Sequence, residues 1–335
     1  MTKPSERNQQ VLLDSRPTGW VTPENFRMVE GARPVPDEGQ VLVRNRWLSL
    51  DPYMRGRISD AKSYAQGVAP GEVMVGGTVG EVVASRSERL AVGDIVLAAT
   101  GWQRFAAINA TQALRIDASE VPAQAYLGVL GMPGITAWTG LMDICQPKAG
   151  ETLVVDAASG AVGGVVGQLG KHLGCRVVGI AGGSRKCEYV VDTLGFDACV
   201  DHRAPDFAEK LAQALPNGID CLFENVGGEI FERLLTLMRP FSRIALCGMV
   251  SDFNREPHAC RTLRAILVQR IRLQGFIVSD KMETWPAIRN SLRELLIGGK
   301  LRYRETIAEG LASAPAAFVG MLRGENFGKQ LVRID

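Results

Sequence analysis

This sequence of 335 residues is poor in the side chains that nucleic-acid-binding and metal-binding proteins need. Its 38 basic and 36 acidic residues are interspersed without a basic run, and aromatic residues make up only 6% of the chain. Few rings can therefore stack on bases, and no nucleic-acid partner is expected. Only three histidines occur (His172, His202 and His258), and the first 144 residues contain neither His nor Cys. Because zinc sites are built mainly from Cys and His, no metal site is expected there.

The sequence also lacks the signals of secreted and membrane proteins. Its opening segment, MTKPSERNQQ, has no apolar core, so no signal peptide is expected. The longest uncharged run, residues 121–142, contains Pro and Gly and is more typical of buried helices than of a membrane span. The seven cysteines are odd in number and form no CxxC pair, which favours reduced thiols in a cytoplasmic protein.

The order of apolar segments predicts two domains. Between about residues 40 and 110, short apolar runs alternate with Gly, Pro and Asp, as in a small, mainly antiparallel β domain. The second half alternates strand-like and helical segments, which is typical of an α/β, doubly wound parallel six-stranded sheet. Its strand-like segments are TLVVD, RVVGIAG, ACVD, GIDCLFE, SRIALCG and IRLQGFIV. The tail breaks this alternation, so we predict one domain of residues 1–125 and 301–335, and a second of residues 126–300.

A glycine-rich stretch, ETLVVDAASGAVGGVVGQLGK (151–171), follows the first of these strands. Ala158, Gly160 and Gly163 match the GxGxxG dinucleotide fingerprint, with alanine at its first position. Such glycines let the backbone turn tightly and approach a pyrophosphate at the start of a helix. The alternative is that they only let a helix pack closely. The position in the first unit of a strand and helix alternation favours the dinucleotide interpretation.

The second strand ends in Gly182, Gly183, Ser184, Arg185 and Lys186. An NAD site would place Asp or Glu here for the ribose hydroxyls, whereas Lys, Arg and a hydroxyl donate hydrogen bonds to a 2′-phosphate. The sequence therefore predicts NADP(H). The alternative is that Arg185 and Lys186 are solvated charges in the first turn of a helix.

Several longer motifs are similar to those of one family. They are LSLDPYMRGR (48–57), VMVGGTVGEVV (73–83), LGVLGMPGITAW (127–138), ENVGG (224–228) and GENFGKQLV (324–332). Over essentially its full length the chain resembles the medium-chain dehydrogenase/reductase superfamily, in the zinc-independent branch of prostaglandin and leukotriene reductases, plant double-bond reductases and bacterial curcumin reductase. The resemblance implies a GroES-like β domain and a Rossmann domain. GGT (76–78) stands where zinc-dependent members carry GHE, so no metal is expected.

The resemblance also implies a set of cofactor contacts, mostly at the carboxyl ends of the parallel strands. His202 is either a contact near the adenosine or a solvent-facing residue. The implied contacts are Gly160, Ala161, Val162 and Gly163 at the pyrophosphate; Gly182, Ser184, Arg185, Lys186 and His202 at the adenosine end; and Asn225, Cys247, Gly248, Met249, Val250, Ser251, Phe253, Phe276, Ile277, Val278 and Asn326 toward the ribose and nicotinamide.

Without a metal, the chemistry expected of such a fold is the reduction of an activated alkene. Hydride goes to the β-carbon of an enone or enal, and the enolate that forms is stabilised and then protonated. Tyr64 is a candidate proton donor on a lid, and Tyr53 is either a substrate contact or a packing residue. The cofactor's own 2′-hydroxyl could replace both.

Two other functions remain open at this point: a quinone reductase, and an NADPH-binding sensor without turnover. Phe253, Val268 and the short linker 255–264 depart from the pattern of relatives, so substrate choice does not transfer. Relatives pair through their last parallel strand, which implies a homodimer joined at IRLQGFIV (271–278).

Overall fold

The computed structural model describes residues 7–334, and the chain divides into two compact units. The first unit, here called the β unit, comprises Met1–Leu127, Glu305–Asn326 and Gln330–Asp335. The second, here called the dinucleotide unit, comprises Gly128–Arg304 and Phe327–Lys329.

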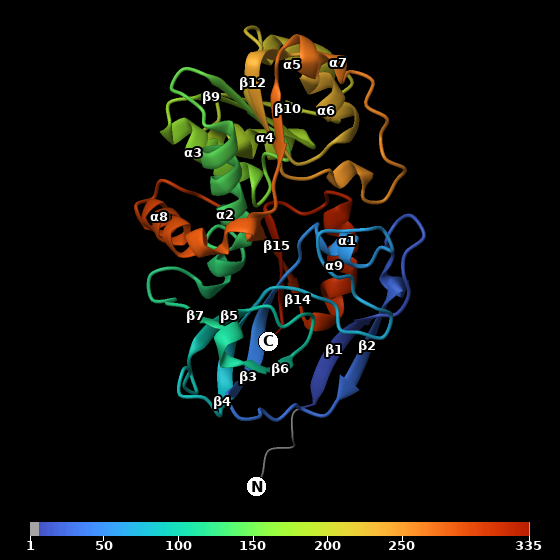
Figure 1. Ribbon diagram of the computed structural model, residues 1–335, viewed down its shortest axis with the longest axis vertical. Coiled ribbons are helices and arrows are strands. Elements are labelled where there is room, and N and C mark those ends of the chain that lie inside the picture. The colour runs from blue at the N-terminus through green and yellow to red at the C-terminus, as the bar shows by residue number, and fades with distance from the viewer. Residues whose placement is uncertain (1–6, 335) are drawn as a thin grey trace. The chain divides into compact units, whose positions relative to one another are not determined.

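The β unit is built around a seven-stranded sheet in the order β14-β15-β3-β4-β5-β7, with β6 paired to β3 and a separate β1-β2 pair (Figure 1). Strand β3 pairs antiparallel with β4, β6 and the tail strand β15, in which Leu331 faces Ser49. The rings of Phe26, Trp102 and Phe318 pack together beside this sheet. Its strands are β1 (Asn8–Leu13), β2 (Phe26–Gly31), β3 (Gln40–Ser49), β4 (Thr78–Ser85), β5 (Ile95–Ala98), β6 (Phe105–Asn109), β7 (Leu114–Arg115), β14 (Glu305–Glu309) and β15 (Lys329–Arg333), and its helices are α1 (Met54–Arg57) and α9 (Ala314–Leu322).

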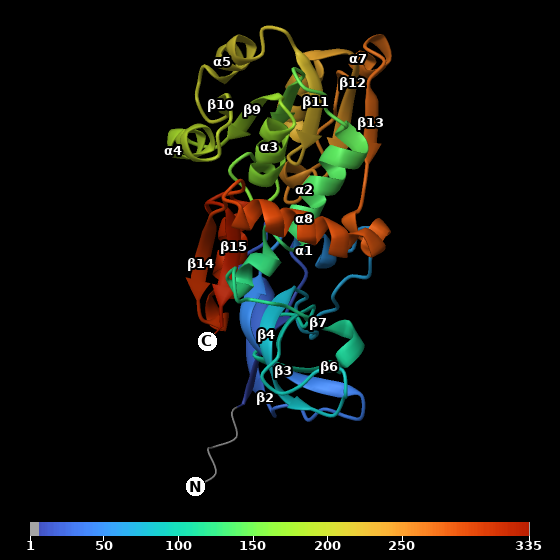
Figure 2. The same cartoon turned by 90° about the vertical axis from the view of Figure 1, so that its left-hand side faces the viewer.

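The dinucleotide unit contains a six-stranded sheet in the order β10-β9-β8-β11-β12-β13, and all neighbouring strands run parallel. Strand β13 lies at one edge of this sheet (Figure 2). The predicted fold class, a doubly wound parallel sheet with a mainly antiparallel β domain, is confirmed. The strands are β8 (Thr152–Val155), β9 (Arg176–Ala181), β10 (Ala198–Asp201), β11 (Ile219–Glu224), β12 (Met238–Leu246) and β13 (Arg272–Gly275). The helices are α2 (Met132–Thr139), α3 (Gly163–His172), α4 (Ser184–Glu188), α5 (Phe207–Ala214), α6 (Gly228–Leu235), α7 (Arg264–Val268) and α8 (Trp285–Ile297).

Helices cover both faces of the parallel sheet. Leu211 of α5 and Leu234 of α6 belong to a buried cluster with Val154 and Leu222 of the strands. Helix α3 packs on strands β8 and β9 so closely that a Cβ on Gly170 would lie 2.5 Å from the Leu153 side chain of β8. These strands are buried on both sides, which is why each reads as a continuous apolar run.

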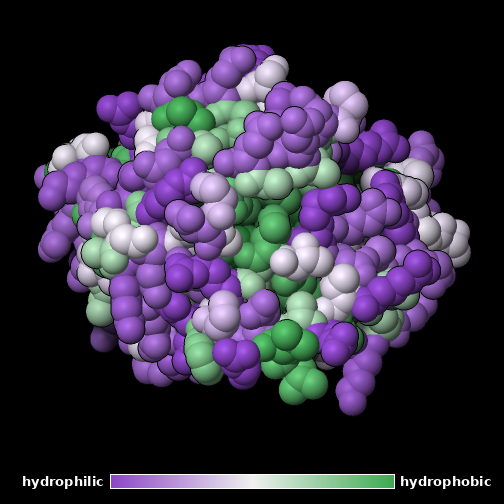
Figure 3. Space-filling model, turned by 90° about the horizontal axis from the view of Figure 1, so that it is seen from above, coloured by the Kyte–Doolittle hydropathy of each residue, from purple (hydrophilic) through white to green (hydrophobic). Residues whose placement is uncertain are grey.

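The surface of the dinucleotide unit carries some exposed apolar side chains. Seen from above, hydrophobic groups come to the surface as a strip among mostly hydrophilic ones (Figure 3). The most exposed apolar residues around α7 are Leu263 (56%), Leu267 (77%) and Val268 (48%). No helix in the described part of the chain is long and apolar enough to cross a membrane.

Candidate cofactor site

The glycine-rich stretch forms a tight turn between β8 and α3. Ala157 adopts a left-handed conformation with φ of 44°, and the Gly160 N–H donates to the Ala157 carbonyl oxygen at 2.8 Å. A Cβ on Gly163 would lie 2.5 Å from that same oxygen, so only glycine fits there. Ala158 is buried, and its N–H donates to the Ile180 carbonyl oxygen of β9 at 3.0 Å.

The same stretch also contains glycines that serve packing alone. A Cβ on Gly170 would lie 2.5 Å from the Leu153 side chain, and a Cβ on Gly167 would lie 1.8 Å from the Phe196 ring. Both interpretations of the glycines, a dinucleotide turn and close helix packing, therefore apply, each to a different part of the stretch. Gly160 and Gly163 shape the turn, Gly170 lets α3 approach β8, and Gly167 makes room for the Phe196 ring.

A small cavity of the dinucleotide unit lies beside the turn. Ser159, Gly160 and Ala161 line one part of it, and Arg302 and Arg304 line another. The cavity holds only about 20 Å³, too little for a pyrophosphate, but its lining shows that Arg302 and Arg304 lie near the start of α3, where N–H groups favour an anion. These arginines lie far from the turn in sequence and were not predicted.

Arg304 and Arg185 meet at one aromatic ring. The guanidinium of Arg304 lies 4.4 Å from the Phe327 ring centroid, and that of Arg185 lies 5.9 Å from it. Tyr189 packs edge-on against the same ring at 5.0 Å. The ring therefore holds a predicted cation, Arg185, and an unpredicted one, Arg304, close together.

The turn after β9 lies beside further cations. A Cβ on Gly182 would lie 2.8 Å from the His202 ring and 2.9 Å from the Arg203 guanidinium, so both side chains lie close to this glycine. Burial and the neighbouring charge of Arg203 lower the pKa of Lys186, which is partly buried. Burial and Arg203 also lower the pKa of His202, although the residue as a whole is exposed.

The carboxylate of Asp201 lies near His202 and Arg203 and is held by the backbone. Asp201 Oδ1 accepts hydrogen bonds from the N–H groups of Gly183 (2.7 Å) and Arg203 (2.9 Å). Although burial opposes them, these bonds keep the pKa of Asp201 below its ordinary value. Lys186 and Arg203 thus bring two positive charges close together, which suits an anion such as a phosphate. Arg203 follows the end of β10, and its position at the same sheet edge as GGSRK was the available signal.

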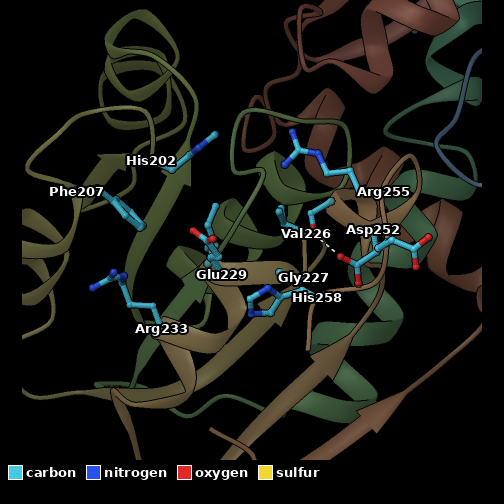
Figure 4. A pocket seen from close by; sticks show the side chains of 13 residues that line it. His202, Phe207, Val226, Gly227, Glu229, Arg233, Asp252, Arg255 and His258 are labelled. Atoms are coloured by element: carbon cyan, nitrogen blue, oxygen red, sulfur yellow. Dashed lines mark hydrogen bonds between the residues drawn. The ribbon is translucent and has the colours of Figure 1, made fainter. Parts of the chain in front are cut away.

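Beyond His202, a larger pocket opens over the amino end of α6. In Figure 4, His202 and Phe207 lie on one side, Arg255 and Asp252 lie on the other, and Glu229 lies between them. The predicted residue Ser251 also lines this pocket, and its hydroxyl donates to Asp252 at 3.1 Å. The structure therefore brings His202 and Ser251 to one pocket.

The loops after β11 and β12 are joined by main-chain hydrogen bonds. The N–H groups of Val250 and Ser251 donate to the carbonyls of Asn225 (3.2 Å) and Val226 (2.8 Å). Gly248 lies so close to Asn225 that a Cβ would lie 3.1 Å from its carbonyl oxygen. The other predicted residues of this loop differ in exposure: Met249 is exposed, and Cys247 and Phe253 are partly buried.

The remaining predicted cofactor contacts differ in their packing and in the unit to which they belong. Phe276 packs edge-on against Phe223 at 6.3 Å, and Ile277 and Val278 follow it as partly buried residues. Asn326 belongs to the β unit and directly precedes Phe327 of the dinucleotide unit.

Within the β unit, the two candidate tyrosines lie against one arginine. The Arg57 guanidinium is 5.5 Å from the Tyr53 ring centroid and 5.1 Å from that of Tyr64. Tyr64 is 60% exposed, whereas Tyr53 is partly buried. Burial and the charge of Asp51 raise the pKa of the Tyr53 hydroxyl, so it stays protonated. Arg57 was not predicted, although it lies in the same DPYMRGR motif.

The histidines and cysteines do not gather into a metal site. Within residues 7–334, no three His, Cys, Asp or Glu side chains cluster closely enough to hold a metal ion. All seven cysteines are free thiols.

An antiparallel β unit, a six-stranded parallel sheet and a glycine turn together define a two-domain dinucleotide-binding oxidoreductase. Residues 9–116 match the family model described as the N-terminal domain of oxidoreductase, and residues 161–294 match the one described as zinc-binding dehydrogenase. The chain is 48% identical to the NADPH-dependent curcumin reductase of Escherichia coli (strain K12), over 100% of this chain and 99% of that protein. It is 40% identical to the 2-alkenal reductase (NADP(+)-dependent) of Nicotiana tabacum, over 98% of each.

The crystal structure of CurA in complex with NADPH from Vibrio vulnificus is also similar, with a TM-score of 0.93 and 48% identity over 98% of this chain and 99% of that one. The chain belongs to the medium-chain dehydrogenase/reductase superfamily and to its zinc-independent branch.

Proposed function

We propose that this protein is an NADPH-dependent reductase of the carbon-carbon double bond of α,β-unsaturated ketones and aldehydes, acting without zinc. The observation that carries the proposal is the full-length similarity to a curcumin reductase and a 2-alkenal reductase, both named as NADP(H)-dependent. The cations that follow β9 and β10 agree with this cofactor, because Lys186 and Arg203 suit a 2′-phosphate.

The residues of the dinucleotide unit fit NADPH in two respects. Gly163 leaves the space in the turn that a Cβ would fill, and Lys186 lies beside a second cation, Arg203, as a phosphate site requires. We assign the pyrophosphate to the turn Gly160–Gly163, with Arg304 nearby. The 2′-phosphate goes to Ser184, Arg185, Lys186 and Arg203; His202 lies at the adenosine; and Asn225 and the loop 247–253 lie toward the nicotinamide, with Phe276, Ile277, Val278 and Asn326.

When bound, NADPH supplies the hydride that the β-carbon receives. The protein's task is then to orient the enone and to stabilise the negative charge that collects on its carbonyl oxygen. We assign the hydrogen bond to this oxygen to Tyr53, whose hydroxyl stays protonated. We assign the proton that reaches the α-carbon to Tyr64, which is exposed on a loop and lies against Arg57.

Initial rates on a panel of enones, enals, quinones and alcohols, each with NADPH and NADH, test this function. We expect turnover of enones and enals, with NADPH preferred over NADH and no oxidation of simple alcohols. Activity confined to quinones would contradict the proposal, as would tight NADPH binding without turnover of any acceptor.

We also propose a homodimer joined through β13. Residues Arg272–Gly275 form an exposed edge strand, and such an edge favours pairing with a second copy. Light scattering should give a dimer, and Leu273→Lys, which puts a charge on the edge, should shift it toward monomer. The matched control is Leu173→Lys, because Leu173 and Leu273 are both 36% exposed. A monomeric wild type would contradict the assignment.

The free thiols support a cytoplasmic location, which cell fractionation can test. Recovery of the protein from an oxidising compartment would contradict it.

A further inference from the structure

Two carboxyl groups lie buried side by side at the carboxyl ends of β8 and β11. Val155 and Phe223 are register partners in these parallel strands, so the residues that follow them, Asp156 and Glu224, are neighbours. Both are fully buried, with 0% of the residue exposed. One N–H group, that of Val226, donates to Glu224 Oε1 at 2.8 Å and to Asp156 Oδ2 at 3.1 Å. The two carboxyl groups therefore meet at a single nitrogen.

The hydrogen-bond donors around the pair are distributed unequally. Asp156 also accepts from the Asn225 main-chain N–H (2.7 Å) and from its side-chain amide (3.1 Å). Glu224 Oε1 accepts from the Gly227 N–H at 2.6 Å. Glu224 Oε2 is buried and meets no N–H donor among the described residues. A buried carboxylate oxygen that accepts no hydrogen bond costs folding free energy. A proton on Oε2 that is donated in a hydrogen bond to Asp156 removes this cost.

We propose that Asp156 and Glu224 share one proton, held on Glu224 Oε2, and that this acid pair is a positioning element of the cofactor site. Two adjacent buried carboxyl groups cannot both ionise, because like charges repel strongly where water is excluded. Asp156 is the ionised partner because it accepts the larger number of N–H groups. The pair acts through the loop that it holds.

That loop connects the pair to the proposed nicotinamide end of the site. The two carboxyl groups hold the N–H groups of Asn225, Val226 and Gly227, and the carbonyls of Asn225 and Val226 hold the N–H groups of Val250 and Ser251. Gly227 takes a φ of 76°, so the loop also turns sharply at this point. Loss of the shared proton would place a second negative charge beneath both loops.

The titration of the pair follows from its surroundings. Burial, and then the charge of Asp156, raise the pKa of Glu224 well above its usual range. The other titratable group that the contacts place beside the pair is Cys247, whose thiol pKa burial raises to about 12, so it stays neutral. The pair therefore holds its proton to a higher pH than an ordinary carboxyl group does, and loses it as the pH rises further.

The test combines a pH profile with a variant that cannot ionise. This inference rests on the proposed NADPH site, so the dissociation constant of NADPH is measured by fluorescence between neutral and alkaline pH. In the wild type the dissociation constant should rise by up to about tenfold per pH unit above the pKa of Glu224, because only the protonated pair holds the loop.

In Glu224→Gln the side-chain amide donates a hydrogen bond to Asp156 at every pH. We expect affinity within about twofold of wild type at neutral pH and no alkaline loss attributable to this pair. The matched control is Glu209→Gln, an exposed carboxyl of α5, which should keep the wild-type profile.

A second measurement does not depend on the cofactor. Infrared spectra of the protein alone at neutral pH should contain the C=O band of a protonated carboxyl, which fades as the pH rises. Glu224→Gln should lack this band, and Glu209→Gln should retain it. A wild type without the band, or NADPH binding with the same alkaline loss in Glu224→Gln, would overturn the proposal. Failure to bind NADPH at any pH, with the band present, would contradict the cofactor assignment and leave the protonated pair standing.

Discussion

Replacing Lys186 with Gln should reduce NADPH affinity selectively. Lys186 is partly buried beside Arg203, and two neighbouring cations suit a doubly charged anion such as a 2′-phosphate. A hydrogen bond to a charged group contributes about 1.5–3 kcal/mol, which corresponds to about 10–150-fold in a dissociation constant. NADH carries no 2′-phosphate, so its affinity should change by less than about twofold.

Calorimetry with 2′,5′-ADP and 5′-AMP isolates the phosphate from the rest of the cofactor. In the wild type 2′,5′-ADP should bind more tightly than 5′-AMP, and Lys186→Gln should remove much of the difference. Arg203→Gln should act in the same direction, because both cations meet the same anion. The control is Lys210→Gln, since Lys210 lies exposed on α5 and pairs with Asp206. Equal losses for both ligands, or for NADPH and NADH, would refute the phosphate assignment.

Three further predictions concern the turn, the proton donor and the acid pair. Gly163→Ala should abolish NADPH binding, because its Cβ would lie 2.5 Å from a backbone oxygen; normal binding would show that the turn is not part of the site. Tyr64→Phe should slow enone turnover by about 10²–10⁴-fold with little change in NADPH affinity, as expected for a lost general acid, and an unchanged rate would remove Tyr64 from the mechanism. The free energy of unfolding of Glu224→Gln should increase relative to that of the wild type as the pH rises above about 4.3. The difference should grow by about 1.4 kcal/mol per pH unit until the pH reaches the pKa of Glu224 in the folded protein. The sign follows because the folded wild type retains a proton that the unfolded chain releases. Native-state hydrogen exchange of β8 and β11 checks it, and a constant difference would contradict it.

Periodicity predicted the parallel sheet well, because its central strands β8, β9 and β11 are almost wholly buried and appear in the sequence as apolar runs. The same pattern predicted an edge strand that is longer than the one observed. The segment IRLQGFIV is paired only over Arg272–Gly275, and Phe276 leaves the strand to pack against Phe223. Apolar character alone cannot tell a paired residue from one that packs beyond the end of a strand.

The glycine turn was predictable because its contacts are local. Arg304 was not predictable, because only the fold brings it near Phe327, and Arg203 was overlooked although it follows β10 at the same sheet edge as Gly182. Asp156 was overlooked for another reason. In the sequence it is a polar residue at the end of a strand, and only the register of β8 and β11 places it beside Glu224.

Tracing the hydride tests the central claim most directly. The protein is incubated with an enone and NADPH that carries deuterium at the transferable C4 position, and the product is analysed by mass spectrometry and NMR. The account predicts a saturated ketone with deuterium on the β-carbon and an intact carbonyl. Deuterium on the carbonyl carbon of an allylic alcohol, or no transfer to any enone, would contradict it.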